Sequence, residues 1–178
     1  MSRNLATFGS GAGTAFDYPE AIGFSRQPFA SLACGPWGPV AGAAGLAIGT
    51  FCWLDPATGE ASNAQAPNTL FGFVLPLSNP YNLWERVYTQ WPVNGVPPFP
   101  QQIIRPGVAC VIAGAGVFSP RFPNGGQVGT QVFADPATGL PYSGNTTGTY
   151  VATPWTLMQS GGPGARLRMS SFIQPFNS

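Results

Sequence analysis

One segment of this chain occurs twice, and it constrains the fold more than any other feature. Residues 47–60 read AIGTFCWLDPATGE and residues 127–140 read QVGTQVFADPATGL, with seven of the fourteen aligned positions identical. In each copy a run rich in β-branched and aromatic side chains meets Asp-Pro-Ala-Thr-Gly. The proline presets φ, the aspartate accepts from amides ahead of it, and the glycine takes the left-handed conformation at low cost. Each copy therefore predicts a strand, a turn and a second strand. The predicted turn-forming residues are Asp55, Pro56, Gly59, Asp135, Pro136 and Gly139.

The glycines and prolines between the apolar segments predict many short strands. The chain has 24 glycines and 20 prolines among 178 residues, which is close to the composition of disordered proteins. Against disorder, 44% of the residues are hydrophobic and 13% are aromatic, enough to offset the entropy of the chain. We therefore expect an all-β fold, a jelly-roll-like sandwich or barrel of short antiparallel strands.

The strands are expected at residues 24–33, 40–54, 70–77 and 107–119, in the second copy of the repeat, and near the C-terminus. In the first copy Ile48, Thr50, Cys52 and Leu54 face one way, whereas Phe51 and Trp53 face the other. Both faces are apolar, so this strand is expected to be covered on two sides or to lie at an interface. Residues 107–119 alternate as a strand pair with a bend at Gly-Ala-Gly.

The predicted organisation is an extended N-terminal arm, residues 1–21, followed by a single β-domain, residues 22–178. The arm is either a flexible tail or a segment that docks on a neighbouring subunit, because it carries three aromatic residues. An aromatic and proline-rich insertion spans about residues 78–106. Its aromatic spacing suits a short helix, but WERVYTQW also alternates as a strand does, so residues 78–91 stay open between the two.

The charge of the chain is unusually low. Acidic and basic residues make up 7% of the sequence, histidine is absent and the formal net charge is +1, whereas ordinary domains carry about 25% charged residues. Weakly charged surfaces tend to associate. Either the protein is a neutral secreted or thermally tolerant domain, or it is a subunit whose surface is largely covered in an assembly.

The sequence offers little chemistry for catalysis, and we expect no enzyme activity. Without histidine or lysine the chain has no Ser-His-Asp triad, no typical zinc site, no Schiff base and no P-loop. We expect no catalytic residue, no cofactor and no metal. Of the three cysteines, Cys52 and Cys110 lie in apolar strands and are expected to be small buried hydrophobes rather than disulfide partners.

The sequence also predicts neither a membrane nor a nucleic-acid partner. No stretch approaches the roughly twenty apolar residues that span a bilayer, and the N-terminus lacks an apolar segment of signal-peptide length. The arginines barely outnumber the acidic residues and form no basic patch. We expect synthesis in the cytoplasm of a host.

Several segments in the same order resemble the structural cement, or head-decoration, proteins of tailed bacteriophages. The resemblance covers roughly residues 24–144. It rests on GPVAGAAGLAIGTFCWLDPATGEASN, then FGFV, then IIRPGVACVIAGAGVF, then the second copy of DPATG. The chain departs from the family's pattern between residues 77 and 102 and in its N-terminal arm.

The resemblance implies a small β-rich protein on the outside of an icosahedral head. There it would form a homodimer or homotrimer, bridge major capsid protein subunits and resist the pressure of packaged DNA. The expected location is the capsid exterior of a virion. The alternative function is a carbohydrate- or receptor-binding β-module of a phage tail fibre or spike, in which exposed tryptophans stack on sugars. The predicted intersubunit or capsid contacts are Phe16, Tyr18, Phe24 and Arg26 towards the N-terminus and Trp84, Tyr88 and Trp91 in the insertion.

Overall fold

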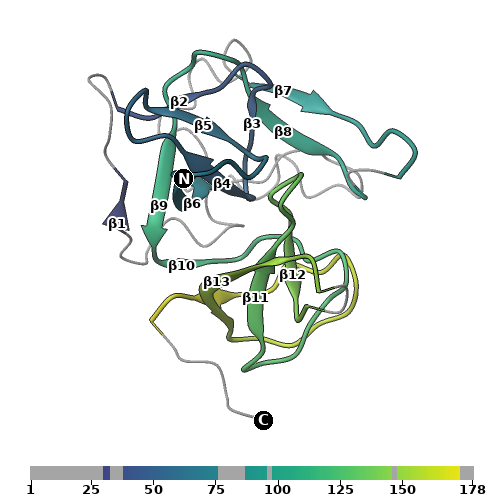
Figure 1. The fold of residues 1–178 in the computed structure, drawn as a ribbon. Coiled ribbons are helices and arrows are strands. Elements are labelled where there is room, and N and C mark those ends of the chain that lie inside the picture. The colour runs from purple at the N-terminus through teal and green to yellow at the C-terminus, as the bar shows by residue number, and fades with distance from the viewer. Residues whose placement is uncertain (1–29, 33–37, 76–86, 96–97, 146–147, 173–178) are drawn as a thin grey trace, which may run out of the picture.

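The fold is all-β, as the sequence predicts. The computed structural model describes residues 30–32, 38–75, 87–95, 98–145 and 148–172, and these residues form strands, turns and loops without any helix. The strands group into sheets of six, five and three strands. In Figure 1 the six- and three-stranded sheets occupy the upper half and the five-stranded sheet the lower half.

The six-stranded sheet has the order β1-β9-β6-β4-β5-β2. All of its neighbouring pairs are antiparallel except β2 and β5, which are parallel. Its strands, in chain order, are β1 (Ala30–Ser31), β2 (Val40–Ala41), β4 (Phe51–Leu54), β5 (Glu60–Ser62), β6 (Leu70–Leu75) and β9 (Val111–Ala115).

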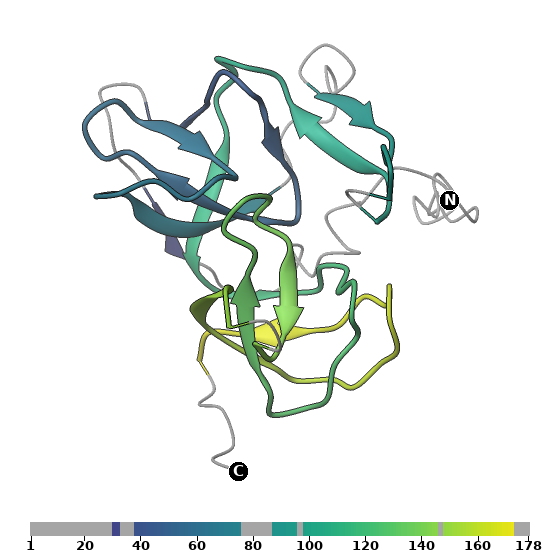
Figure 2. The same ribbon diagram turned by 45° about the vertical axis from the view of Figure 1, so that its right-hand side comes forward.

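The two smaller sheets are antiparallel throughout. The five-stranded sheet has the order β10-β14-β13-β11-β12, and the three-stranded sheet has the order β3-β8-β7. Figure 2 shows the β7–β8 hairpin at the outer side of the molecule. The strands are β3 (Leu46–Ala47), β7 (Val87–Gln90), β8 (Gln101–Ile104), β10 (Val117–Phe118), β11 (Gln131–Ala134), β12 (Pro141–Ser143), β13 (Val151–Leu157) and β14 (Met169–Ser170).

The two copies of the repeat fold into matching three-stranded units. The first copy places β4 between β5 and β6, and the second places β11 between β12 and β13. The hairpin registers correspond, because Leu54 faces Ala61 in the first copy and Ala134 faces Pro141 in the second. The structural similarity of the two units therefore extends beyond the repeated motif to a third strand in each unit.

Strand β4 separates two hydrophobic cores, which confirms the prediction that it is covered on both faces. Cys52 and Leu54 lie in the core shared with the three-stranded sheet, together with Leu46 of β3 and Ile104 of β8. The opposite face of β4 belongs to the core shared with the five-stranded sheet. There Phe51 and Trp53 pack with Phe73, Phe118, Val132, Trp155 and Leu157, among others.

Residues 40–54 form three short strands rather than the one strand that the sequence predicts. Turns fall between β2 and β3 and between β3 and β4, where Gly45 and Gly49 have φ of 78° and 76°. Positive φ is incompatible with an extended strand and is accessible mainly to glycine. The breaks carry the chain from the six-stranded sheet to the three-stranded sheet and back.

Several other predictions are tested by the described residues. The break expected in residues 107–119 is confirmed at Gly116, which joins β9 of one sheet to β10 of another. Cys52 and Cys110 are buried and are not joined to each other by a disulfide, also as predicted. Val87–Gln90 is a strand, which decides the open question for those four residues. The N-terminal arm, residues 1–21, and the start of the insertion, residues 78–86, lie outside the described residues.

Candidate functional site

Trp91 is the predicted contact residue whose side chain can be assessed, and it is exposed. It follows β7 directly and has 61% of its surface accessible. Tyr88 belongs to β7, one of the two edge strands of the three-stranded sheet. The other predicted contacts lie outside the described residues; they are Phe16, Tyr18, Phe24, Arg26 and Trp84.

The loop from Trp91 to Gly95 presents apolar surface at the end of β7. Val93 is 66% exposed, so two large apolar side chains lie within three residues. Asn94 and Gly95 then turn the chain with φ of 53° and 76°. Consecutive positive φ values at Asn-Gly are the signature of a tight hairpin turn. The sequence contains this signal, but the prolines around it led us to expect an extended segment instead.

Phe99, which lies shortly before β8, contacts the second half of the chain. The guanidinium of Arg121 lies 5.9 Å from the centre of the Phe99 ring, within the range of a cation–π contact. Nη1 of Arg121 also donates to the carbonyl of Gly164 at 3.4 Å. The chain between β7 and β8 thus has an exposed apolar portion directly after β7 and a contact with the second half of the chain before β8.

The two Asp-Pro-Ala-Thr-Gly turns share two short hydrogen bonds at equivalent positions. In the first, the amide of Gly59 donates to the carbonyl of Asp55 at 2.8 Å, and the amide of Ala57 donates to Oδ1 of Asp55 at 2.8 Å. In the second, Gly139 donates to the carbonyl of Asp135 at 2.8 Å, and Ala137 donates to its Oδ1 at 2.7 Å. Both aspartates act as turn residues, as the sequence predicts.

The second turn docks on the first repeat, which the sequence does not reveal. The amide of Phe51 in β4 donates to the carbonyl of Gly139 at 2.7 Å, and the amide of Gln65 donates to the carbonyl of Pro136 at 2.7 Å. A Cβ atom at Gly139 would collide with the carbonyl oxygen of Phe51. Gly139 is therefore needed for close approach as well as for its φ of 70°.

The side chain of Asn63 forms three hydrogen bonds beside this junction. Its Oδ1 accepts from the amide of Ala47 at 2.8 Å, and its Nδ2 donates to Oγ1 of Thr50 and to the carbonyl of Phe51, each at 2.8 Å. One amide group thus links the end of β5 to β3, to β4 and to the turn between them. All of these bonds join Asn63, three residues after the first copy of the repeat, to residues of that copy.

We expect Asn63→Ala to lower the free energy of unfolding by about 2 kcal/mol, because it removes the side chain that bonds the amide of buried Ala47 and the carbonyl of buried Phe51. Urea denaturation checks this value. Asn124→Ala is the matched control. Asn124 is exposed and bonds Ser143, so its loss is expected to cost less than 1 kcal/mol, as most surface substitutions do. Equal costs for the two variants would contradict this role of Asn63.

The fold shifts the pKa of two ionisable side chains, Asp55 and Cys52. Hydrogen bonds from the Ala57 amide and the Thr58 hydroxyl lower the pKa of Asp55, so the turn is made by the carboxylate form. Burial, with a smaller contribution from the nearby Cys110, raises the pKa of the Cys52 thiol well above its usual value. Cys52 is thus a protonated, inert thiol at neutral pH.

Within the described ranges, no three His, Cys, Asp or Glu side chains gather in a way that could hold a metal ion. The same residues include no helix that is long and apolar enough to cross a membrane. No protein-family model matches the chain, and no curated protein is significantly similar to it.

Proposed function

We propose that this chain is a structural virion protein, a cement or decoration protein that binds the outer surface of an icosahedral phage head and bridges major capsid protein subunits. The observation that carries the proposal is the exposed apolar loop after β7. Trp91 and Val93 are more than half exposed there, although burying them would be favourable. Tryptophan is enriched among the residues that dominate the energy of protein interfaces.

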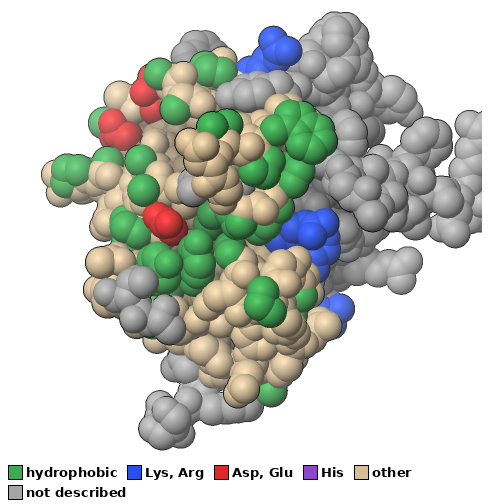
Figure 3. Space-filling view, turned by 90° about the vertical axis from the view of Figure 1, so that its right-hand side faces the viewer, with side chains coloured by type: hydrophobic (Ala, Val, Ile, Leu, Met, Phe, Trp, Pro, Cys, Tyr) green, Lys and Arg blue, Asp and Glu red, His purple; other side chains and the backbone are tan. Residues whose placement is uncertain are grey.

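The scarcity of charge supports the same function. Figure 3 shows a face of mixed hydrophobic and uncharged polar side chains, with acidic and basic groups at a few separate places. Covering such a surface requires the desolvation of few ions, which is the costly step in forming an interface. Charged residues are likewise depleted from the cores of known interfaces.

The proposed mechanism is linkage between binding and assembly. A protein that binds the assembled shell, but not its separated subunits, stabilises the shell by the free energy of its contacts. The effect is repeated at every equivalent position of the lattice, and contacts to two subunits at once add avidity. Each binding position on the lattice would hold two or three copies of the protein, as expected for a homodimer or a homotrimer.

Heads of the phage that encodes this chain provide the test. We expect heads assembled without the chain to release their DNA at a lower temperature, and to survive osmotic shock less often, than heads that contain it, because the contacts between shell subunits are fewer. A dye that reports released DNA measures the first effect and plaque counts measure the second. Adding back the purified chain should restore both. Equal resistance with and without the chain would contradict the proposed function.

A further inference from the structure

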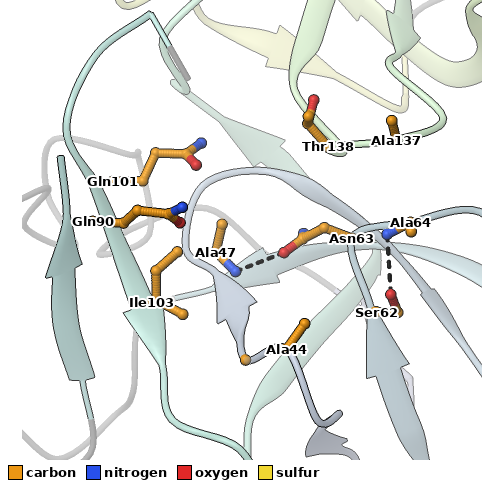
Figure 4. Close-up of a pocket in the computed structure, with 11 residues that line it drawn as sticks. Ala44, Ala47, Ser62, Asn63, Ala64, Gln90, Gln101, Ile103, Ala137 and Thr138 are labelled. Carbon is orange, nitrogen blue, oxygen red and sulfur yellow. Dashed lines mark hydrogen bonds between the residues drawn. The ribbon is translucent and has the colours of Figure 1, made fainter. Parts of the chain in front are cut away.

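A pocket lies between the three-stranded sheet and the second turn, and Trp91 and Val93 of the exposed loop described above do not line it. Its volume is about 300 Å³, at the lower end of the range for small-molecule sites. Strands β7 and β8 form one side, the end of β5 forms another, and Ala137 and Thr138 of the second turn close the pocket opposite Gln101 (Figure 4). The docking of the second turn on the first repeat therefore creates this pocket.

The lining of the pocket is uncharged. Of its eleven residues, five are alanine or glycine and five carry uncharged polar side chains. No lining residue is ionic or aromatic. A charged ligand would find no opposite charge there, and a flat apolar ligand would find no ring to stack on. The chemistry suits a compact, neutral ligand with several hydrogen-bonding groups.

The side chain of Gln101 has a donor at this pocket that is left without a hydrogen-bond partner. The residue is only 8% exposed, and its Nε2 is buried without any hydrogen bond. Figure 4 shows its amide pointing from β8 into the pocket. A buried amide donor left unpaired is costly, and such groups in folded proteins call for an explanation. Because Nε2 has almost no accessible surface, the side chain of Gln101 would turn on binding to bring this donor to an acceptor oxygen of the ligand.

Gln90 provides a second amide beside the first. It is the cross-strand partner of Gln101, and its side chain points to the same side in Figure 4. Asn63 also lines the pocket, but its oxygen and nitrogen are already bonded to Ala47, Thr50 and Phe51. The two glutamines are therefore the amides available to a ligand.

We propose that this pocket binds one unit of a neutral sugar. A side-chain amide offers both donors and an acceptor, and a hydroxyl group does the same, so adjacent amides match a ring that carries several hydroxyls. The glutamines stand on the face of the β7–β8 sheet. An extended peptide would instead be expected to add along a strand edge. This proposal does not rest on the role in a capsid.

The test uses the purified full-length chain and a panel of neutral sugars: glucose, galactose, mannose and N-acetylglucosamine. We expect at least one of them, at millimolar concentration, to shift the side-chain amide signals of Gln101 and Gln90 in a ¹⁵N-correlated NMR spectrum. Gln101→Met should weaken the binding by about tenfold, because it removes the amide and keeps the volume. Gln102→Met is the matched control, since Gln102 is a buried neighbour on β8 that does not line the pocket.

A second variant blocks the pocket from its rim. Ala64 is exposed and lines the pocket, so Ala64→Phe is expected to abolish sugar binding without disturbing either core. Gln101→Met should leave the melting temperature of the sugar-free protein unchanged or higher, because it removes a buried Nε2 donor that has no hydrogen bond. Loss of binding in that variant then cannot be attributed to unfolding.

Three results would overturn the proposal. The first is the absence of any shift of the Gln101 amide with every sugar. The second is sugar binding that both variants leave intact, which would place the site elsewhere. The third is a shift of that amide by a synthetic peptide of residues 1–21 but by no sugar, which would make the occupant a peptide. None of these results bears on the binding of the chain to heads.

Discussion

Replacing Gly139 by alanine is expected to lower the free energy of unfolding by about 4 kcal/mol, a loss typical of severe core defects. Two costs add together. The residue has a φ of 70°, a conformation that costs an L-amino acid about 1 kcal/mol or more. The new methyl group would also collide with the carbonyl oxygen of Phe51, and the second turn would have to move away from β4. That movement breaks the bond from the Phe51 amide to the Gly139 carbonyl.

Gly144→Ala separates these two costs. Gly144 has a φ of 72°, close to that of Gly139, but a Cβ atom there would meet nothing within 4 Å. Its substitution should therefore cost only about 1 kcal/mol, from the backbone conformation alone. Urea denaturation of both variants measures the difference. If the two substitutions destabilise the protein equally, the second turn does not dock on β4 as described.

Trp155→Ala is expected to cost about 4 kcal/mol, in the range for removing a buried tryptophan. Trp155 is completely buried between the six- and five-stranded sheets. Its ring centre lies 5.4 Å from that of Phe51 and 6.3 Å from that of Phe71, and its indole nitrogen donates to the carbonyl of Gly116 at 3.3 Å. The substitution therefore opens a cavity in the core that joins the two repeats.

Met158→Ala is the control for this prediction. Met158 follows the same strand, β13, but is 38% exposed, so its truncation should change stability by less than about 0.5 kcal/mol. Because the repeats share one core, tryptophan fluorescence and far-UV circular dichroism should report a single common transition in every variant. Separate transitions for the two repeats, or a small effect of Trp155→Ala, would contradict a shared core.

Local features of the fold could be predicted from the sequence. Asp-Pro-Ala-Thr-Gly specifies its turn through short-range bonds to the Asp55 and Asp135 carboxylates, and nothing distant is needed. The alternation of Cys52 and Leu54 with Phe51 predicts a strand with two apolar faces. Such patterns depend only on residues that are close in the sequence, so the local structure that they predict does not depend on long-range pairing.

Long-range pairing could not be predicted in the same way. No local sequence pattern shows that β2 pairs in parallel with β5. The same is true of the hydrogen bond from the Phe51 amide to the Gly139 carbonyl, which joins residues far apart in the sequence. The division of residues 40–54 between two sheets is not predicted, because Gly45 and Gly49 stand in an apolar run that also suits one continuous strand.

In the candidate site, too, some residues can be predicted from the sequence and others cannot. Trp91 was singled out from its aromatic character, and its exposure agrees with a contact role. Gln101 was not singled out, because a glutamine in QQII carries no signal until the fold buries its amide beside a pocket.

Binding of the purified chain to heads that lack it tests the central claim most directly. We expect the chain to sediment with such heads and to saturate at a fixed number of copies for each head. Trp91→Ser should weaken binding by about 30-fold, the effect of losing an interface residue worth about 2 kcal/mol. Leu70→Ser, at an exposed apolar residue on another sheet, is the control. A chain that stays in the supernatant at every concentration would contradict the proposed function.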